Sequence, residues 1–409
     1  MRHLAARFIP KIGEQSLMSK STQFQFNLSP VHVVDPNLDF RDNFKNFEKL
    51  RENLEKRKMF DLLSNLPKIQ DDYFRWLKAY INFSSSAVDK KDVSQRDLYF
   101  VFRGELLKHS EGLLAALSLP NSLDAKQSQQ FIQRFDLKNY EEDLDEILQN
   151  VRSDKSSALF LRDLRSSLLK FVKKSLKPSP IPISGPFLVR PALVECCNID
   201  LNEFPLITDG IDSPFCLVGT HIPSFLSVLV NGLISSLNDW PISLLASGPI
   251  YQRSSTNSKQ FNQSERISIL TLGRNEDECT KRQMKICEIF SAFLQKFLQD
   301  EVKIYVSIIE KQPERLQLWE RSSTIFVGKI NESDDEIIQI ASFSNIGDYI
   351  SRRAHVTFNS SNKKCAKNDG KEDGNKNNDQ NYVQMAFATI DLDYLSNDSK
   401  YQKFFNTLI

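Results

Sequence analysis

The stretch from Gln339 to Phe358 reads QIASFSNIGDYISRRAHVTF, and it decides the fold of this chain. It places Ser-Asn first, then an aspartate beside an aromatic residue, and then two adjacent arginines. It ends in HVTF, whose β-branched and aromatic residues are typical of a strand. This order of residue types is the most informative pattern in the chain, and the segments around it determine how it is interpreted.

Length and composition set broad limits on the function. The 409 residues, 40% of them hydrophobic, can bury a full core, and the length predicts two or three structural units. Lys and Arg (53) nearly balance Asp and Glu (52), so contact with nucleic acid would need a local basic patch. The six cysteines and five histidines show no paired ligand spacing, so we predict no metal site. No apolar run is long enough to span a membrane.

Residues 1–25 are expected to form a mitochondrial presequence, or transit peptide. The segment MRHLAARFIPKIGEQSLMSKS has several basic residues but a single acid, Glu14. Leu4, Phe8 and Ile9 can share one helical face opposite the arginines, which is typical of such presequences. A frayed basic terminus is the alternative interpretation. The presequence would place the protein in the mitochondrial matrix.

Residues 36–125 are predicted to form a helical N-terminal domain with an antiparallel hairpin arm. Apolar residues recur at steps of three and four, first in a single stripe and then along two facing seams, as in a coiled coil. The polar tip SSSAVDKKDVSQ separates the seams, and Pro120 ends the domain. Residues 126–155 are interpreted as a polar, acidic linker. The stripe and seams comprise Phe40, Phe44, Phe47, Leu50 and Leu54, then Tyr73, Trp76, Tyr80 and Phe83, then Tyr99, Phe102, Leu106, His109, Leu113 and Ala116.

Residues 156–409 are predicted to form a second, α+β domain. An amphipathic helix from Ser156 to Lys170 is followed by proline-bounded strand signals in PSPIPISGPFLVRPALV. Helical and strand patterns then alternate, which predicts an antiparallel sheet with flanking helices. The polar, low-complexity insertion 359–381 is expected to be disordered because it cannot bury a core.

The opening stretch, the ending LSLPN and the proline-bounded segment together resemble seryl-tRNA synthetases, a class II family. The resemblance implies a class II antiparallel sheet preceded by a helical hairpin. It also implies a dimer, with an interface formed by Gly185, Val189 and Pro191. The partner would be a second copy or the authentic mitochondrial seryl-tRNA synthetase.

In this family the helical arm grips the variable arm of its tRNA, and basic residues at matching positions become candidate contacts. Each such residue would add affinity mainly through counterion release. Acidic residues such as Asp71, Asp72 and Asp89 lie among them, so a solvated surface of mixed charge is the alternative. The candidates are Arg75, Lys78, Lys90, Lys91, Arg96 and Arg103.

The family joins serine to ATP in a pocket whose floor matches the opening stretch. This chemistry needs a carboxylate for the serine amino group and fixed positive charge for the triphosphate. Several positions match the outline of that pocket, and we interpret them as a vestigial substrate site. They are Thr220, Arg253, Gln339, Ser342, Ser344, Asn345 and Arg353.

The charged residues that the family uses to bind serine and ATP are missing from this substrate site. His221 and Ile222 stand where the serine-binding carboxylate is expected, and Gln339 replaces a glutamate associated with ATP and its metal. Ser254 and Ser255 stand where another acid is expected. After Arg353 the chain contains no arginine that could clamp ATP.

We therefore expect a non-catalytic mitochondrial paralogue, most similar to the degenerate seryl-tRNA synthetase-like proteins of insect mitochondria. It would act by dimerisation and tRNA contact and would need no cofactor. The alternative is a divergent but active mitochondrial serine-tRNA ligase, which would use ATP and Mg²⁺.

Overall fold

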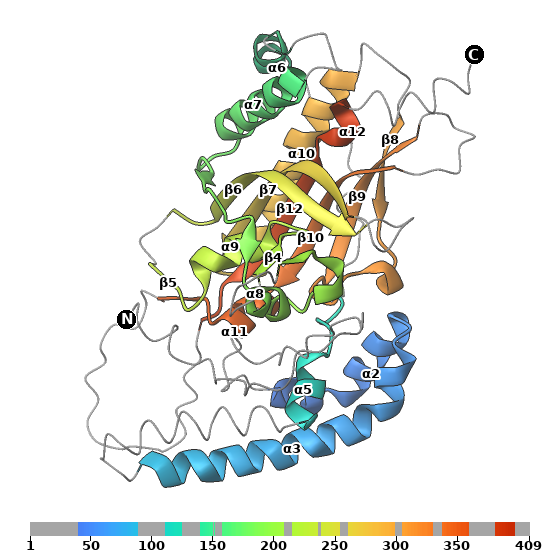
Figure 1. The fold of residues 1–409 in the computed structure, drawn as a ribbon, viewed down its shortest axis with the longest axis vertical. Helices are drawn as coiled ribbons and strands as arrows, with labels where there is room; N and C mark the ends of the chain where they lie inside the picture. Colours follow the sequence, from blue (N-terminus) through green and yellow to red (C-terminus); the bar gives the residue numbers. More distant parts are fainter. Residues whose placement is uncertain are drawn as a thin grey trace, which may run out of the picture.

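The computed structural model consists of a helical N-terminal domain below a sheet-based C-terminal domain (Figure 1). The structure describes residues 40–88, 111–124, 140–149, 151, 158–207, 215–235, 239–253, 261–298, 305–329, 338–359 and 381–396. The predicted presequence lies outside these ranges, as do residues 360–380 of the predicted insertion over 359–381.

The N-terminal domain is built on the apolar stripe and seams predicted from the sequence. Phe40, Phe44 and Leu54 are buried against Tyr73 and Trp76 of one long helix, and a short helix packs on it after the gap from 89 to 110. The described residues thus contain one long helix of the predicted hairpin, α3, and the end of the returning helix, α5, which packs on it. The helices of this domain are α1 (Arg41–Lys45), α2 (Phe47–Lys56), α3 (Phe60–Val88) and α5 (Glu111–Leu117).

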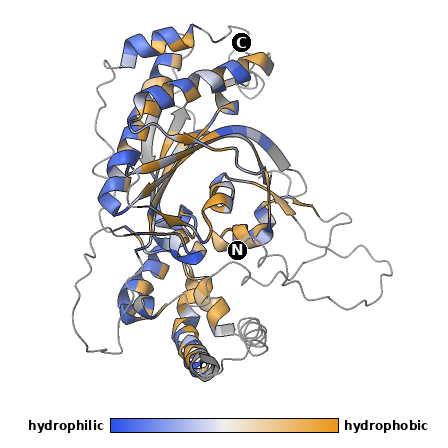
Figure 2. Cartoon of the chain, turned by 90° about the vertical axis from the view of Figure 1, so that its left-hand side faces the viewer, coloured by the Kyte–Doolittle hydropathy of each residue, from blue (hydrophilic) through white to orange (hydrophobic). Residues whose placement is uncertain are grey.

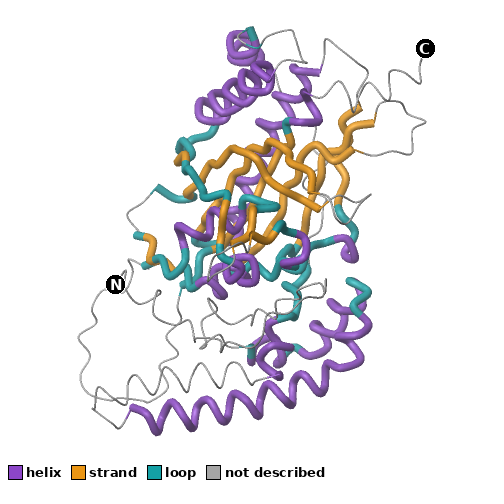
Figure 3. Tube along the Cα trace, in the orientation of Figure 1, coloured by secondary structure: helices purple, strands orange, loops and turns teal. Residues whose placement is uncertain are grey.

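The C-terminal domain is organised around a seven-stranded sheet in the order β1-β6-β7-β12-β10-β9-β8. All neighbouring strands are antiparallel except β1 and β6. Figure 3 shows this sheet between helices at either end of the molecule. Its strands are β1 (Ile181–Pro182), β6 (Ile242–Arg253), β7 (Phe261–Gly273), β8 (Tyr305–Glu310), β9 (Ser322–Lys329), β10 (Ile338–Gly347) and β12 (Gln384–Asp391).

Helices cover both faces of the sheet, because alternate residues of its strands are apolar toward each side. One face packs on α6 (Glu141–Leu148), α7 (Ala158–Ser175) and α10 (Glu276–Leu298). Figure 2 shows largely hydrophobic strands inside and hydrophilic outer turns on the flanking helices. The other face packs on α8 (Pro191–Cys196), α9 (Ile222–Leu229) and α11 (Tyr349–Ala354).

Short elements complete the domain. Two small sheets flank the helices of the second face, whereas α12 follows the last strand of the main sheet and packs against α7 on the first face. These elements are β2 (Leu188–Val189), β3 (Leu206–Ile207), β4 (Phe215–Leu217), β5 (Leu233–Ile234), β11 (Thr357–Phe358), α12 (Asp393–Ser396) and the single-turn helices η2 (Leu201–Glu203) and η3 (Pro313–Arg315).

The linker predicted over residues 126–155 needs correction. It contains α6, whose Leu144 and Ile147 are buried in the same core as α7 and α10. The acidic residues that suggested a linker belong to the solvent side of this helix, and Asp143 pairs with Lys174 of α7. Residues 140–149 are therefore part of the C-terminal domain.

Candidate functional site

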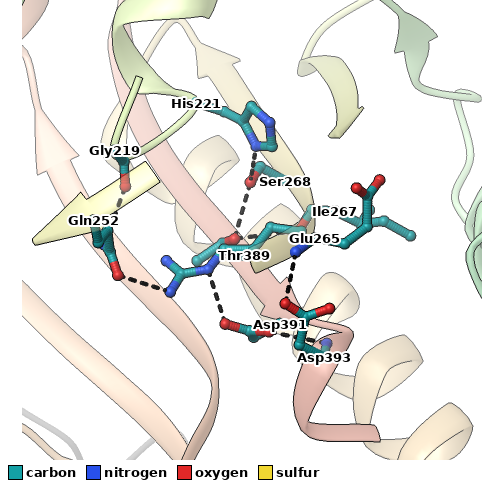
Figure 4. A network of polar contacts seen from close by, with 10 residues as sticks. Gly219, His221, Gln252, Glu265, Ile267, Ser268, Thr389, Asp391 and Asp393 are labelled. Atoms are coloured by element: carbon teal, nitrogen blue, oxygen red, sulfur yellow. Dashed lines mark hydrogen bonds and ion pairs between the residues drawn. The ribbon is translucent and has the colours of Figure 1, made fainter. Parts of the chain in front are cut away.

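A row of hydroxyl side chains crosses the centre of the second sheet face. Ser268 of β7 lies opposite Thr389 of β12, which lies opposite Ser342 of β10, so all three point to the same side. The Oγ of Ser268 is 2.9 Å from Thr389 Oγ1, and Thr389 donates to the carbonyl of Ile267 (Figure 4). The hydroxyl groups of Ser268 and Thr389 are thus hydrogen-bonded to each other across the two strands.

His221 contacts the Ser268 end of this row of hydroxyl side chains. Its Nδ1 is 2.8 Å from the Oγ of Ser268, and the side chain is almost completely buried at the start of α9. Burial, reinforced by the nearby charge of Arg266, lowers the pKa of His221 to about 4. The imidazole is therefore neutral at neutral pH, and within the described part of the chain its Nε2 has no hydrogen-bond partner.

The charged groups beside this row are paired with one another. Arg266 Nε donates to Asp391 Oδ2 at 3.1 Å, and its Nη2 donates to Gln252 Oε1 at 3.1 Å. Gln252 in turn donates to the carbonyl of Gly219, next to the half-buried Thr220 (Figure 4). The guanidinium of Arg266 is thus held by protein acceptors rather than left open for a phosphate.

A second polar cluster surrounds Ser344, one of the predicted pocket residues. Ser344 Oγ donates to Glu320 Oε1 at 2.5 Å and is 3.2 Å from Ser323 Oγ. Glu320 also accepts from the backbone N–H of Gln317 and lies 3.6 Å from Lys311 Nζ. Ser344 is therefore a buried partner of Glu320, a residue that the sequence analysis did not single out.

The end of the opening motif faces the N-terminal domain. Arg353 is buried and donates to the carbonyl of Leu117 at 2.8 Å, where α5 ends, and to that of Cys196 at 3.0 Å. Tyr349 donates to the carbonyl of Leu119 at 2.7 Å. Asn345 donates to Asp124 at 3.1 Å. Three residues of one motif therefore bind the segment that leaves the helical domain.

Arg57 and Asn121 complete this domain junction from the other side. The Asn121 side chain donates to the carbonyls of Trp319 and Ile346, at 3.0 and 2.6 Å. Arg57 Nη2 donates to the carbonyls of Asn121 and Glu320, at 3.1 and 2.6 Å. Because charge-assisted hydrogen bonds are stronger than neutral ones, these contacts fix the helical domain firmly. Hereafter, "domain junction" means Arg57, Asn121, Asn345, Tyr349 and Arg353.

Arg57 was not among the residues predicted from the sequence. Arg57 is only 5% exposed, and burial lowers the pKa of its guanidinium to about 10, an effect that the Glu320 carboxylate partly offsets. Asn53 lies one helical turn earlier and accepts from Arg57 Nε at 3.0 Å. The signal in the sequence is faint, since a polar pair four residues apart on a helix usually faces water.

A groove of about 580 Å³ runs along the domain junction. It separates α2 from α11, and its walls carry both charges, including Lys49, Lys56, Glu52 and Asp348. Arg352 also lines it, but this side chain is paired with Asp348. The groove therefore presents a mixed surface rather than a site for one charged ligand.

The remaining predicted residues are dispersed. Gln339 is exposed at the start of β10, and Arg253 ends β6 with its side chain outside the described part of the structure. Val189 and Pro191 are buried within the chain, and Gly185 is half-buried beside Ser224. Of the candidate tRNA contacts, Lys90, Lys91, Arg96 and Arg103 fall in the gap from 89 to 110, and Arg75 and Lys78 are exposed on α3.

Metal-binding clusters and membrane-spanning helices are both absent from the described residues. No cluster of three His, Cys, Asp or Glu side chains there could hold a metal ion. Within the same ranges, no helix is long and apolar enough to cross a membrane.

No protein-family model matches the chain, and no curated protein matches its sequence. Its structure is similar to cytoplasmic serine-tRNA ligase from Naegleria fowleri in complex with AMP, with a TM-score of 0.57, 14% identity and coverage of 88% of this chain and 90% of that one. It is equally similar to seryl-tRNA synthetase from Pyrococcus horikoshii complexed with ATP, with a TM-score of 0.57, 15% identity and coverage of 87% and 91%. The chain therefore has the class II fold of seryl-tRNA synthetases, an antiparallel sheet with flanking helices behind a helical arm.

Replacing Asn121 by Ala should destabilise the protein strongly. The change leaves the buried carbonyls of Trp319 and Ile346 without their donor, which costs on the order of 3 kcal/mol in the free energy of unfolding. Urea denaturation followed by circular dichroism measures this loss. Ser122→Ala, at the exposed neighbouring position, is the control and should change stability little. Equal stability of the two variants would contradict the role of Asn121.

His221 should make the fold sensitive to mild acid. The unfolded chain binds a proton at its histidine near pH 6.5, whereas the native histidine does so only near pH 4, so native stability falls as the pH drops between these values. From pH 7 to 5 the wild type should lose about 2 kcal/mol more than His221→Asn. Denaturation curves at both pH values test this, and an equal loss in both proteins would contradict it.

Proposed function

We propose that this protein is a non-catalytic mitochondrial paralogue of seryl-tRNA synthetase that acts by dimerisation and tRNA contact. The fold it shares with serine-tRNA ligases supports the ancestry. The observation that supports loss of catalysis most directly is the self-paired row of Ser268 and Thr389 beneath a neutral His221.

Serine activation requires charges that stay open to substrate. The amino group of serine needs a carboxylate, and the triphosphate needs cations that stabilise negative charge in the transition state. On this face Asp391 and Arg266 neutralise each other, and Glu320 is occupied by Ser344 and Lys311. A chain arranged in this way would bind neither ATP nor Mg²⁺ productively.

In this proposal, the motif from Gln339 to Phe358 has a structural role at the domain junction instead of a catalytic one. Asn345, Tyr349 and Arg353 hold the exit of the helical domain, so these residues are needed wherever the arm must keep its orientation. A paralogue that has lost activation but still uses its arm would therefore retain them. This accounts for a motif that survives without its chemistry.

The proposed partner is a second copy or the authentic mitochondrial seryl-tRNA synthetase. Val189 and Pro191 are buried within the chain, so they would shape the interface segment rather than touch the partner. The exposed apolar residues of the same segment, Ile181, Phe187 and Leu188, would make the contact. Residues 1–25 would direct the chain to the mitochondrial matrix.

Purified protein should show no serine-dependent exchange of pyrophosphate into ATP. An active seryl-tRNA synthetase in the same assay is the positive control, and the readout is the rate of labelled ATP formation. Exchange at a rate near that of the control would favour the alternative, an active serine-tRNA ligase, over our proposal.

Charge reversal on the arm should weaken binding of mitochondrial serine tRNA. In Arg75→Glu/Lys78→Glu two exposed cations of α3 become anions, and we expect affinity to fall about tenfold or more at low salt. The matched control, Lys170→Glu/Lys173→Glu, makes the same charge change on exposed positions of α7. Filter binding across a salt series measures both. An equal loss in the two variants would show that only net charge matters and would contradict contact through the arm.

A further inference from the structure

The α2 wall of the groove at the domain junction carries excess positive charge. Lys49 and Lys56 lie two turns apart on α2, both are exposed, and neither forms a hydrogen bond or an ion pair with a described residue. The acid between them, Glu52, is exposed in the same way. Behind them, the buried guanidinium groups of Arg57 and Arg353 are hydrogen-bonded to uncharged acceptors. This wall therefore favours an occupant that carries acidic groups.

The groove also offers apolar contacts and amide groups. Leu50, Leu123 and Tyr349 contribute apolar surface to its lining. Asn43 and Asn46, which follow closely after the first described residue, have side-chain amides without a partner in the described part of the chain. Each of these amides can donate and accept, which matches the needs of a peptide backbone. Together, these groups suit a peptide segment that has both apolar and acidic side chains.

The chain itself enters the described structure at this groove. Phe40 is the first described residue, and it lines the groove. Its backbone N–H donates to Tyr73 Oη at 2.9 Å, and its ring lies edge-on to that of Tyr73 at 5.6 Å, so the entry point is fixed. Residues 30–39 can extend about 33 Å from this point. The ten-residue helix α2 is only about 15 Å long, so these residues can reach along all of it.

The sequence of residues 30–39, PVHVVDPNLD, has the chemistry that the groove requires. Between Lys20 and Arg41 the chain contains two acids, Asp35 and Asp39, and no Lys or Arg. Four of the ten residues are valine or leucine, and two are proline, which is unfavourable inside a helix. The segment directly before the groove is thus acidic and apolar, whereas the α2 wall is basic and partly apolar.

We propose that residues 30–39, which lie outside the described residues, bind in the groove of the same chain as an extended segment. Asp35 and Asp39 then pair with the two lysines of α2, and the valines cover the apolar lining. The bound segment connects α2 with α11 and forms a second link between the helical arm and the sheet domain. It also shields the hydrogen bonds of the domain junction from water, which strengthens them. The inference depends on neither the dimerisation nor the tRNA contact of the proposed function.

Hydrogen–deuterium exchange of the full chain, followed by mass spectrometry, tests this binding directly. In the wild type, the amides of residues 31–39 should exchange about tenfold or more slowly than those of an unstructured peptide. Lys49→Glu/Lys56→Glu replaces two attractive contacts with repulsive ones, so exchange of the same amides should become about tenfold faster. Exchange in α6 and α7 shows whether each variant remains folded.

A matched control and a rescue variant make the test specific. Lys170→Glu/Lys173→Glu makes the same change in net charge at exposed positions of α7, far along the chain from the groove, and should leave exchange of residues 31–39 unchanged. Adding Asp35→Lys/Asp39→Lys to the groove variant reverses both sides of the contact. This fourfold variant should recover most of the wild-type protection.

Three results would overturn the proposal. Wild-type exchange at the rate of an unstructured peptide would show that residues 31–39 are not bound. Equal protection in the wild type and in Lys49→Glu/Lys56→Glu would place the bound segment somewhere other than the groove. Protection that increases with protein concentration would show that a second copy supplies the segment, which contradicts binding within one chain.

Discussion

The structure depends on one set of hydrogen bonds, those that Arg57 and Asn121 make across the domain junction. Their donors reach four carbonyls, in three segments that lie far apart in the sequence, and these hydrogen bonds are buried. Buried donors and acceptors of this kind are costly to separate. The helical arm therefore has one orientation relative to the sheet, and any partner bound by the arm is held in a defined place beside the C-terminal domain.

The same constraint explains how the motif from Gln339 to Phe358 could be retained in a protein that, as we propose, no longer activates serine. Along β10 and α11, Ser342 and Ser344 face the interior of the sheet domain, whereas Asn345, Tyr349 and Arg353 bind the exit of the helical domain. In the proposed paralogue, loss of substrate binding would relax the demand on Ser342 and Ser344, and the pairing of Ser344 with Glu320 fits this proposal. Residues of the second group remain indispensable because removing any of them leaves buried carbonyls or amides without partners.

Much of the fold could be predicted from the sequence, because amphipathic periodicity marks helices and strands directly. The hairpin stripe from Phe40 to Leu54, the α+β class and the antiparallel sheet are confirmed. The helix α6 was missed because its acids hid an apolar face of Leu144 and Ile147. In the site, Ser344 was identified without its partner Glu320, and the contact of His221 with Ser268 was missed, since both depend on strand register rather than on local pattern. The dimer segment and the tRNA contacts stay predictions.

The central claim is that the face which should hold seryl-adenylate is occupied by its own side chains. Isothermal titration of the purified protein with a non-hydrolysable seryl-adenylate analogue tests this most directly, with an active seryl-tRNA synthetase as the positive control. The self-paired Ser268, Thr389, Arg266 and Asp391 predict no measurable binding at millimolar ligand, a range that excludes affinities tighter than about −4 kcal/mol. Saturable binding with a micromolar dissociation constant would contradict the claim, because it would require this face to open and present free charges to the ligand.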